Sequence, residues 1–293
     1  MGDHFELPGD DRAVSTVIGF IMIFAMLIIL LSTYQALWVP IQNEQVEYDH
    51  YQTVSDDMTD ARSAIFEART NGETQSTTVK LGTRYPTRLI AVNPPPATGR
   101  LETGPRRNIS IAYQDGTEID MAARYPGINS EDEIYIQFLS YSPNYNELDT
   151  GAPIRHEHGL LYKNFAETGQ GGGLVIQNKG QTLVRTYEQG TNEVTLVPIQ
   201  GNYSEQGVER VSLDPEPGIL VSREFTDVNV TVPTDLREST WEDVLSGQMA
   251  PEDIVVNAGG RRIDTRSGWN VGCAICAYRS GRNTNIWGTW FSK

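Results

Sequence analysis

Three short stretches of the chain carry residue types that could do chemistry. His156-Glu157-His158 places two imidazoles at alternate positions, and alternate residues of a strand face the same side of a sheet. The pair could therefore supply two metal ligands. The other histidines, His4 and His50, lie far away in the chain, so a third ligand would have to be a carboxylate. The alternative, which the sequence favours, is an exposed strand end or turn.

Cys273 and Cys276 form a CxxC motif. A structural zinc site needs four ligands, and no second CxxC or histidine pair lies in this region of the sequence. A redox pair is expected at a helix N-terminus near a βαβ unit, and the sequence shows neither. A local disulfide outside the cell, or two incidental thiols, is therefore the favoured interpretation.

The glycine-rich stretch 169–173 precedes a strand-like segment rather than opening a helix. It therefore lacks the helix N-terminus that lets a glycine-rich loop bind phosphate, and it predicts a hairpin connection. The sequence also contains no GxSxG nucleophile elbow and no HExxH zinc motif. We therefore expect a protein that is not an enzyme, with no cofactor, no metal and no identifiable small-molecule substrate.

The charge balance argues against nucleic acid as a partner. The chain of 293 residues has 38 acidic and 23 basic side chains and a net charge of −15, whereas a phosphate-binding surface needs clustered Lys and Arg. Lysine is rare and occurs at Lys80, Lys163, Lys179 and Lys293. This pattern is typical of proteins in concentrated salt, where a Debye length of about 3 Å at 1 M screens carboxylate repulsion. An ordinary acidic protein is the alternative.

One apolar segment predicts the compartment. No charged residue occurs between Arg12 and Glu44, and residues 14–31 are apolar with three small or polar exceptions. About 20 such residues span a bilayer as a helix. Tyr34 and Trp38 follow the run, where amphipathic aromatic side chains favour the membrane interface. We expect a single-pass membrane protein whose transmembrane helix covers residues 14–38.

The residues ahead of this helix, 1–13, form an acidic leader that differs from an ordinary secretory signal. Arg12-Ala13-Val14 lies at the start of the apolar run and is similar to the site at which archaeal prepilin peptidases cut. Cleavage between Ala13 and Val14 would leave a helix with no charged side chain at its tip. A signal anchor that is never cut is the alternative.

A second helical pattern covers residues 41–70 as an amphipathic stalk. Pro40 is expected to end or kink the membrane helix before it. Four apolar residues share one face at spacings of four, three and four: Val54, Met58, Ala61 and Ile65. This face either packs against other subunits or covers the protein's own sheet, and both interpretations stay open. Asn71-Gly72 is expected to end the helix.

Residues 75–256 predict a β-rich ectodomain. Short strand-like segments alternate with turn residues such as Pro94-Pro95-Pro96, as in a sandwich or related antiparallel fold. The expected strands cover 77–83, 88–92, 108–114, 132–141, 173–178, 193–199 and 228–232. A short helix is expected over 239–245. The predicted class is α+β, a long N-terminal transmembrane and stalk helix followed by a mainly antiparallel, sandwich-like ectodomain.

Residues 257–293 form a tail of different composition. They hold one acidic residue, Asp264, against six basic ones, both cysteines and three of the five tryptophans. Such a tail could bind a membrane surface or a partner, or it could be a divergent or frame-shifted end that is foreign to the fold. The second interpretation predicts that deleting the tail leaves the stability of the β domain unchanged.

Three Asn-x-Ser/Thr triplets begin at Asn108, Asn202 and Asn229. They are acceptor sequences for N-glycosylation and agree with an external location of the ectodomain. Such triplets also arise by chance in a chain with many Asn and Thr residues.

The segment RAVSTVIGF at the start of the apolar helix resembles the N-terminus of haloarchaeal type IV pilin-like proteins. The segments VPIQNEQVEYDHYQTVSDDM, KLGTRYPTRLIAVNPPPATG and VTVPTDL are similar to a family of larger haloarchaeal pilin-like membrane proteins of unassigned function, and the likeness covers residues 13–245. It implies a cell-surface protein of salt-loving archaea with a helical stem and a β-rich head. Two features depart from it: Thr16 stands where the pilin motif commonly has Pro, and the tail is not a strand-rich ending.

Two functions are therefore expected. The first is a pilin-like cell-surface subunit, a minor pilin or adhesion component, anchored by its N-terminal helix with the ectodomain outside the cell. Its expected partners are the membrane, a prepilin peptidase and homologous pilin-like subunits in a surface filament. The second is a singly anchored surface protein whose β domain binds a ligand, a glycan or an envelope component.

Overall fold

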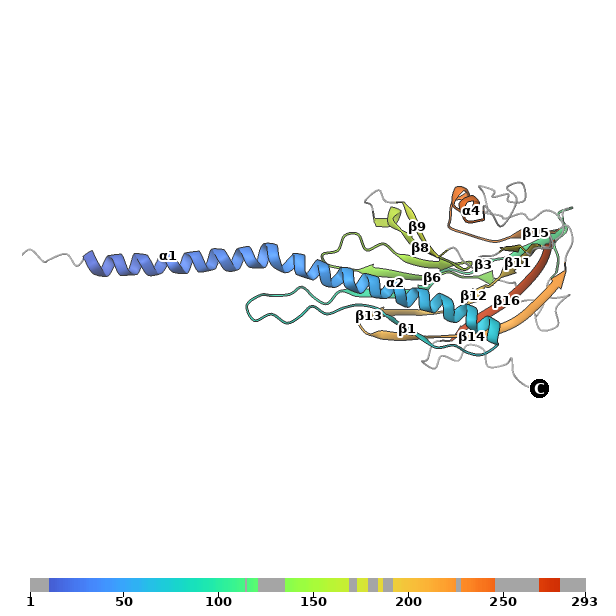
Figure 1. Cartoon of the computed structure of the whole chain (residues 1–293), viewed down its shortest axis with the longest axis horizontal. Helices are drawn as coiled ribbons and strands as arrows, with labels where there is room; N and C mark the ends of the chain where they lie inside the picture. The colour runs from blue at the N-terminus through green and yellow to red at the C-terminus, as the bar shows by residue number, and fades with distance from the viewer. Residues whose placement is uncertain are drawn as a thin grey trace, which may run out of the picture.

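The structure, a computed structural model, describes residues 11–113, 115–120, 135–168, 173–178, 184–186, 192–224, 228–245 and 269–279. One long helix leads from the N-terminal side into a β-rich head, and the second half of the helix lies along the head (Figure 1). The prediction of an α+β protein with a long N-terminal helix and mainly antiparallel sheets is confirmed.

The long helix has three consecutive parts. These are α1 (Asp11–Thr33), a π-helical turn η1 (Tyr34–Trp38) and α2 (Val39–Asn71). The helix does not end at Pro40, which lies in the first turn of α2. Ahead of it, the N–H of Val39 donates to the carbonyl of Tyr34, five residues earlier. A π turn of this kind is a local adjustment that lets a helix continue past a proline, which has no N–H.

The end of α2 agrees with the sequence. Gly72 adopts a left-handed conformation with φ of 70°, and its N–H donates to the carbonyl of Ala68 at 3.0 Å. Glycine takes this conformation without the steric penalty of a Cβ atom. The prediction that the helix ends at Asn71-Gly72 is therefore confirmed.

Most strands of the head are short. They are β1 (Thr77–Lys80), β2 (Thr98–Thr103), β3 (Arg107–Asn108), β4 (Ser110–Tyr113), β5 (Tyr135–Ile136), β6 (Leu139–Asn144), β7 (Ile154–Glu157), β8 (Leu160–Asn164), β9 (Leu174–Asn178), β10 (Val184–Thr186), β11 (Asn192–Leu196), β12 (Ile199–Gln200), β13 (Ser204–Gly207), β14 (Arg210–Glu224), β15 (Val228–Thr231) and β16 (Trp269–Arg279). A 3₁₀ turn, η2 (Phe165–Thr168), follows β8, and the short helix α4 (Glu238–Leu245) follows β15.

In the described part of the chain, these strands form two six-stranded sheets and two two-stranded sheets. The first large sheet has the order β1-β14-β16-β11-β10, with β12 also paired to β16, and the second has the order β13-β2-β6-β7-β8-β9. The small sheets pair β15 with β4 and β3 with β5. Neighbours are antiparallel, except that β16 runs parallel to β11 and to β12.

The apolar face of α2 packs against both large sheets. Its four predicted residues, Val54, Met58, Ala61 and Ile65, are at most 2% exposed. They share one core with Val79 of β1, Leu213 of β14 and Tyr141 of β6. Of the two interpretations that the sequence left open, the structure shows that this face covers the protein's own sheets. The head is therefore built around α2, which is not a free stalk.

The predicted strand over residues 88–92 is absent. These residues lie in a loop, 84–97, whose base is closed by the bridge between Thr83 and Ala97. At this base Gly82 passes so close to the Ala97 carbonyl that an added Cβ atom would lie 2.3 Å from it. The consecutive apolar residues 89–92 gave a strand-like pattern, but Leu89 and its neighbours face solvent instead of a sheet.

Part of the tail belongs to the head. Residues 269–279 form β16, which is antiparallel to β14 and parallel to β11. The interpretation of 257–293 as foreign to the fold is therefore wrong for this stretch, and deleting it is not expected to be silent. The signal was an uncharged run between Arg266 and Arg279 that contains Trp, Val, Ile and Tyr residues, which favour strands. The other tail residues lie outside the described residues.

Candidate functional site

The most distinctive surface of the molecule is α1. Its large apolar side chains from Val17 to Leu31 are between 45% exposed, at Leu31, and 70% exposed, at Phe20. Phe20 and Phe24 stack on each other along the helix with ring centroids 6.5 Å apart. Among the described residues, this is the one helix that is long and apolar enough to cross a membrane. Water is a poor solvent for such a surface, so α1 has the properties of a membrane anchor.

The residues expected at the processing site begin this helix. Arg12, Ala13 and Val14 lie in the first turn of α1. The leader before Asp11 lies outside the described residues. The cleavage between Ala13 and Val14 stays a prediction.

Glu47 fastens α2 to the head. Its side chain is fully buried on α2, and one carboxylate oxygen, Oε2, accepts the N–H groups of Glu147 at 2.9 Å and Leu148 at 2.6 Å. The other oxygen, Oε1, accepts the N–H of Asn146 at 2.8 Å and the hydroxyl of Tyr85. Four donors from two loops compensate for the removal of this carboxylate from water.

Two further polar residues of α2 lie on the same buried face. Asn43 accepts a hydrogen bond from Arg88 at 2.9 Å. His50 Nδ1 and the Tyr145 hydroxyl hydrogen-bond at 2.8 Å. Burial lowers the pKa of His50 from 6.5 to about 4, so this imidazole is neutral at pH 7. Together with Glu47, these residues form a polar joint between the helix and the loops that follow β1 and β6.

The His156-Glu157-His158 segment is buried, and only part of it is a strand. His156 lies on β7, whereas His158 lies in the turn to β8 with φ of 50°. The prediction that both imidazoles occupy alternate positions of one strand is therefore wrong, because the strand ends at Glu157. The alternative of a turn is correct, but not that of an exposed one, since His158 is 3% exposed.

His156 is 1% exposed, and neither of its ring nitrogens has a hydrogen-bond partner. Burial, aided by the positive charge of Arg62, lowers its pKa to about 3. The ring is therefore neutral, with one N–H donor left unpaired. Within the part of the chain that the structure describes, no group of three or more His, Cys, Asp or Glu residues could hold a metal ion.

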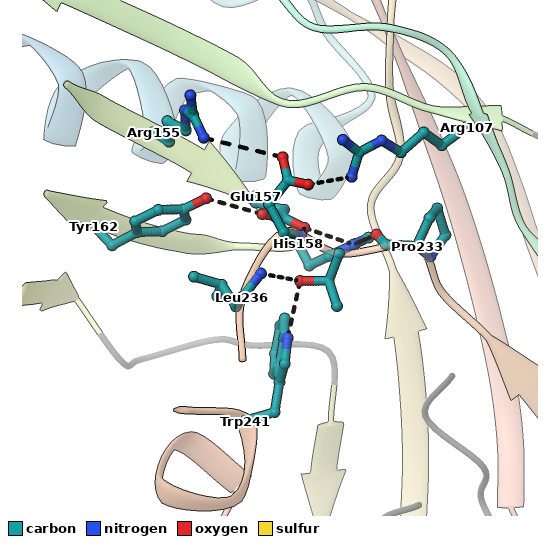
Figure 2. Close-up of polar contacts among 10 residues, drawn as sticks. Arg107, Arg155, Glu157, His158, Tyr162, Pro233, Leu236 and Trp241 are labelled. Carbon is teal, nitrogen blue, oxygen red and sulfur yellow. Dashed lines mark hydrogen bonds and ion pairs between the residues drawn. The ribbon is translucent and has the colours of Figure 1, made fainter. Parts of the chain in front are cut away.

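Glu157 is the centre of a polar cluster at the β7–β8 hairpin (Figure 2). Its Oε2 accepts the Tyr162 hydroxyl at 3.0 Å, and its Oε1 accepts the N–H of Asp235 at 3.0 Å. The Asp235 carboxylate pairs with Arg107 at 2.8 Å. Burial, with Glu157 beside it, raises the pKa of Tyr162, so the phenol stays protonated and donates.

The cluster also holds the segment between β15 and α4. Burial lowers the pKa of His158, and the neutral ring donates from Nε2 to the carbonyl of Pro233 at 2.7 Å. Thr234 Oγ1 accepts the indole N–H of Trp241 at 2.9 Å and the N–H of Leu236 at 3.1 Å (Figure 2). The cavity beside Glu157 and His158 measures about 10 Å³, about the space of one water molecule. The cluster therefore holds the segment between β15 and α4 against the β7–β8 hairpin, and the cavity beside it is too small for a substrate.

The CxxC motif lies within a strand, and the glycine-rich motif lies between two strands. Cys273 and Cys276 are both on β16. The interpretation of this motif as a local disulfide or two incidental thiols stays a prediction. The stretch 169–173 connects β8 to its antiparallel neighbour β9, which confirms the predicted hairpin connection, although residues 169–172 lie outside the described residues.

The three glycosylation triplets lie at different places in the head. Asn108 on β3 and Asn202 between β12 and β13 are exposed. Asn229 lies on β15, which pairs with β4. The exposed positions are compatible with modification, which stays a prediction.

Comparison with known proteins gives one archaeal relative. An uncharacterized protein of Archaeoglobus fulgidus is 27% identical to this chain over 136 residues. The matched region is 46% of this chain and 22% of that protein, so the chain matches about a fifth of the relative's length. No family model matches the chain, and no solved structure matches it.

The polar joint was missed from the sequence, although a signal for it exists. The buried stripe that includes Val54 continues towards the N-terminus through His50, Glu47 and Asn43 at spacings of four, three and four. Polar residues at core positions need buried partners. The stripe alone could have indicated that these three side chains meet polar groups of the head.

Proposed function

We propose that the protein is a pilin-like cell-surface subunit, anchored in the membrane by α1, with its β-rich head outside the cell. The observation that carries the proposal is the contrast along one continuous helix. From Val17 to Leu31 the apolar side chains are at least 45% exposed, whereas α2 is packed into the head. Lipid or the apolar helices of neighbouring subunits can both surround such a surface. A subunit that is first anchored and then assembled uses both surroundings in turn.

The acidic leader fits this sequence of events. Residues 1–13 hold all the charged side chains that precede Glu44. Burying these charges among apolar helices would be costly, so removing the leader prepares the tip of α1 for assembly. The proposal assigns Arg12, Ala13 and Val14 to recognition by a prepilin peptidase. The protein is also proposed to work in concentrated salt, in agreement with its acidic composition.

The experiment is to determine the N-terminus of the native protein by mass spectrometry and to compare two variants. The wild type and a leader variant, Pro8→Ala, should begin at Val14, whereas Ala13→Glu should keep residues 1–13. The processed protein should appear in filaments sheared from the cell surface. An intact N-terminus in the native membrane, with no protein in the sheared fraction, would instead favour the singly anchored surface protein with a ligand-binding head.

A further inference from the structure

Among the described residues of the head, those of the loop 84–97 include the most exposed large apolar side chains. Leu89 is 104% exposed, Ile90 is 76% exposed and Val92 is 78% exposed. We call residues 89–92 the apolar loop tip. Such a cluster at the end of a loop is unusual on a surface that faces only water, and exposed apolar patches mark interaction sites.

The loop tip is tied to the helix at a defined height. Gln35 makes two hydrogen bonds with the backbone of Val92: its Nε2 donates to the Val92 carbonyl at 2.8 Å, and its Oε1 accepts the Val92 N–H at 3.0 Å. The neck of the loop is closed by Asn93, which donates to the carbonyl of Pro86 at 2.8 Å. Figure 1 shows the loop reaching along the helix towards its N-terminal half.

Gln35 lies where the apolar helix would leave the hydrocarbon. It follows Thr16 by 19 residues, which correspond to about 28 Å of helix against a hydrocarbon thickness of about 30 Å. Trp38, one turn further, is 54% exposed, as expected of an aromatic residue at the membrane interface. The loop tip is thus held beside the helix at the level of the lipid headgroups.

We propose that the apolar loop tip inserts into the boundary between headgroups and acyl chains, as a second membrane contact beside α1. This inference rests on the proposed anchoring of α1. Arg88 precedes the tip and hydrogen-bonds to the amide oxygens of Asn43 and Gln42. With both α1 and the apolar loop tip in the membrane, the orientation of the head relative to the membrane would be fixed. With α1 alone, the head could rotate about the helix axis.

The experiment uses the full-length protein, one copy per lipid nanodisc, in a Cys273→Ser, Cys276→Ser background. A polarity-sensitive fluorophore is attached at Ile90→Cys, and quenching is measured with lipids brominated near the headgroup. Leu27→Cys on α1 reports anchoring, with quenching by lipids brominated deep in the chain. Val175→Cys is the matched control, because this valine of β9 is also exposed, at 49%, but lies towards the far part of α2.

The proposal predicts a blue-shifted, quenched label at Ile90 and an unshifted, unquenched label at Val175. If the Leu27 label is quenched while the Ile90 label behaves like the Val175 label, the anchor holds and the loop contact is wrong. If the Leu27 label is unquenched, the anchoring itself fails. If the Ile90 label becomes shielded only in discs with several copies, the loop tip docks on a second copy of this chain, and the lipid assignment is overturned.

Discussion

The two halves of the long helix reverse the usual relation between hydrophobicity and burial. α1 has no charged residue between Arg12 and Thr33, and its large apolar side chains are exposed. α2 is rich in polar and charged residues, yet Asn43 and Glu47 on it are fully buried. In a protein surrounded only by water, the more apolar half would be the buried one. The comparison indicates that the two halves have different solvents.

The two halves of the helix are also held in place by different contacts. The apolar contacts of α1 come from its surroundings, whereas α2 is held to the head by an apolar stripe and by hydrogen bonds between specific residues. Arg62 illustrates the second case: its Nε donates to the carbonyl of Gly159 at 2.7 Å, and its guanidinium lies 4.8 Å from the ring centroid of Phe66. Substitutions of buried residues on α2 should therefore change the stability of the head, while substitutions of apolar residues on α1 should not.

The largest effect is expected at Glu47. Glu47→Ala removes the acceptor of three backbone N–H groups, of which that of Leu148 is buried and those of Asn146 and Glu147 are partly buried, so we expect a loss of about 3–5 kcal/mol in the free energy of unfolding. Glu44→Ala is the matched control, since Glu44 is exposed on the same helix and its change should lie within about 0.5 kcal/mol. Urea unfolding of the full-length protein in detergent measures both. Equal losses would show that the polar joint does not hold the head.

A pair of methionines tests the comparison with identical chemistry. Met58 on α2 is 0% exposed and Met26 on α1 is 65% exposed. Met58→Ala should lower the free energy of unfolding by about 2–5 kcal/mol, because it leaves a cavity in the core. Met26→Ala should leave the unfolding of the head within about 0.5 kcal/mol of wild type. A large loss from Met26→Ala in detergent would show that α1 packs on the head, and the claim that the two halves of the helix have different surroundings would be wrong.

The sequence predicted the features of the fold that depend on local pattern. The uncharged run before Glu44 gave the apolar helix, and the spacing of Val54 and Met58 gave the buried face of α2. Gly72 gave its end. These patterns repeat within a few residues, so a single segment contains the whole signal. The strand-like pattern of 88–92 failed for the same reason, because a short apolar run does not show whether a neighbouring strand is present to pair with it.

The polar joint depends on residues that are distant in the sequence. Asn146 donates to Glu47 across 99 residues of chain, and no local pattern marks that pairing. The turn at His158 is another case: the sequence favoured an exposed strand end or turn, and the turn is there, but His158 is buried. Here tertiary hydrogen bonds, such as that from His158 to Pro233, decide the local conformation.

The smallest effect is expected at His156, which is buried without a hydrogen-bond partner and so contrasts with Glu47. The pKa of His156 in the folded protein, about 3, lies below the ordinary 6.5. Between these two pH values the imidazole is therefore protonated in the unfolded chain and neutral in the folded protein. Stability should therefore fall as the pH drops from 6.5 towards 3. His156→Leu should abolish about 2 kcal/mol of the loss between pH 7 and 5 without lowering stability at pH 7.

His50→Leu should also flatten the pH profile of stability, because the pKa of His50 is about 4, but it should cost about 0.5–1.5 kcal/mol at pH 7 through the hydrogen bond lost to Tyr145. Urea unfolding at both pH values separates the two variants, and an unchanged profile in His156→Leu would mean that this ring already titrates in the folded protein.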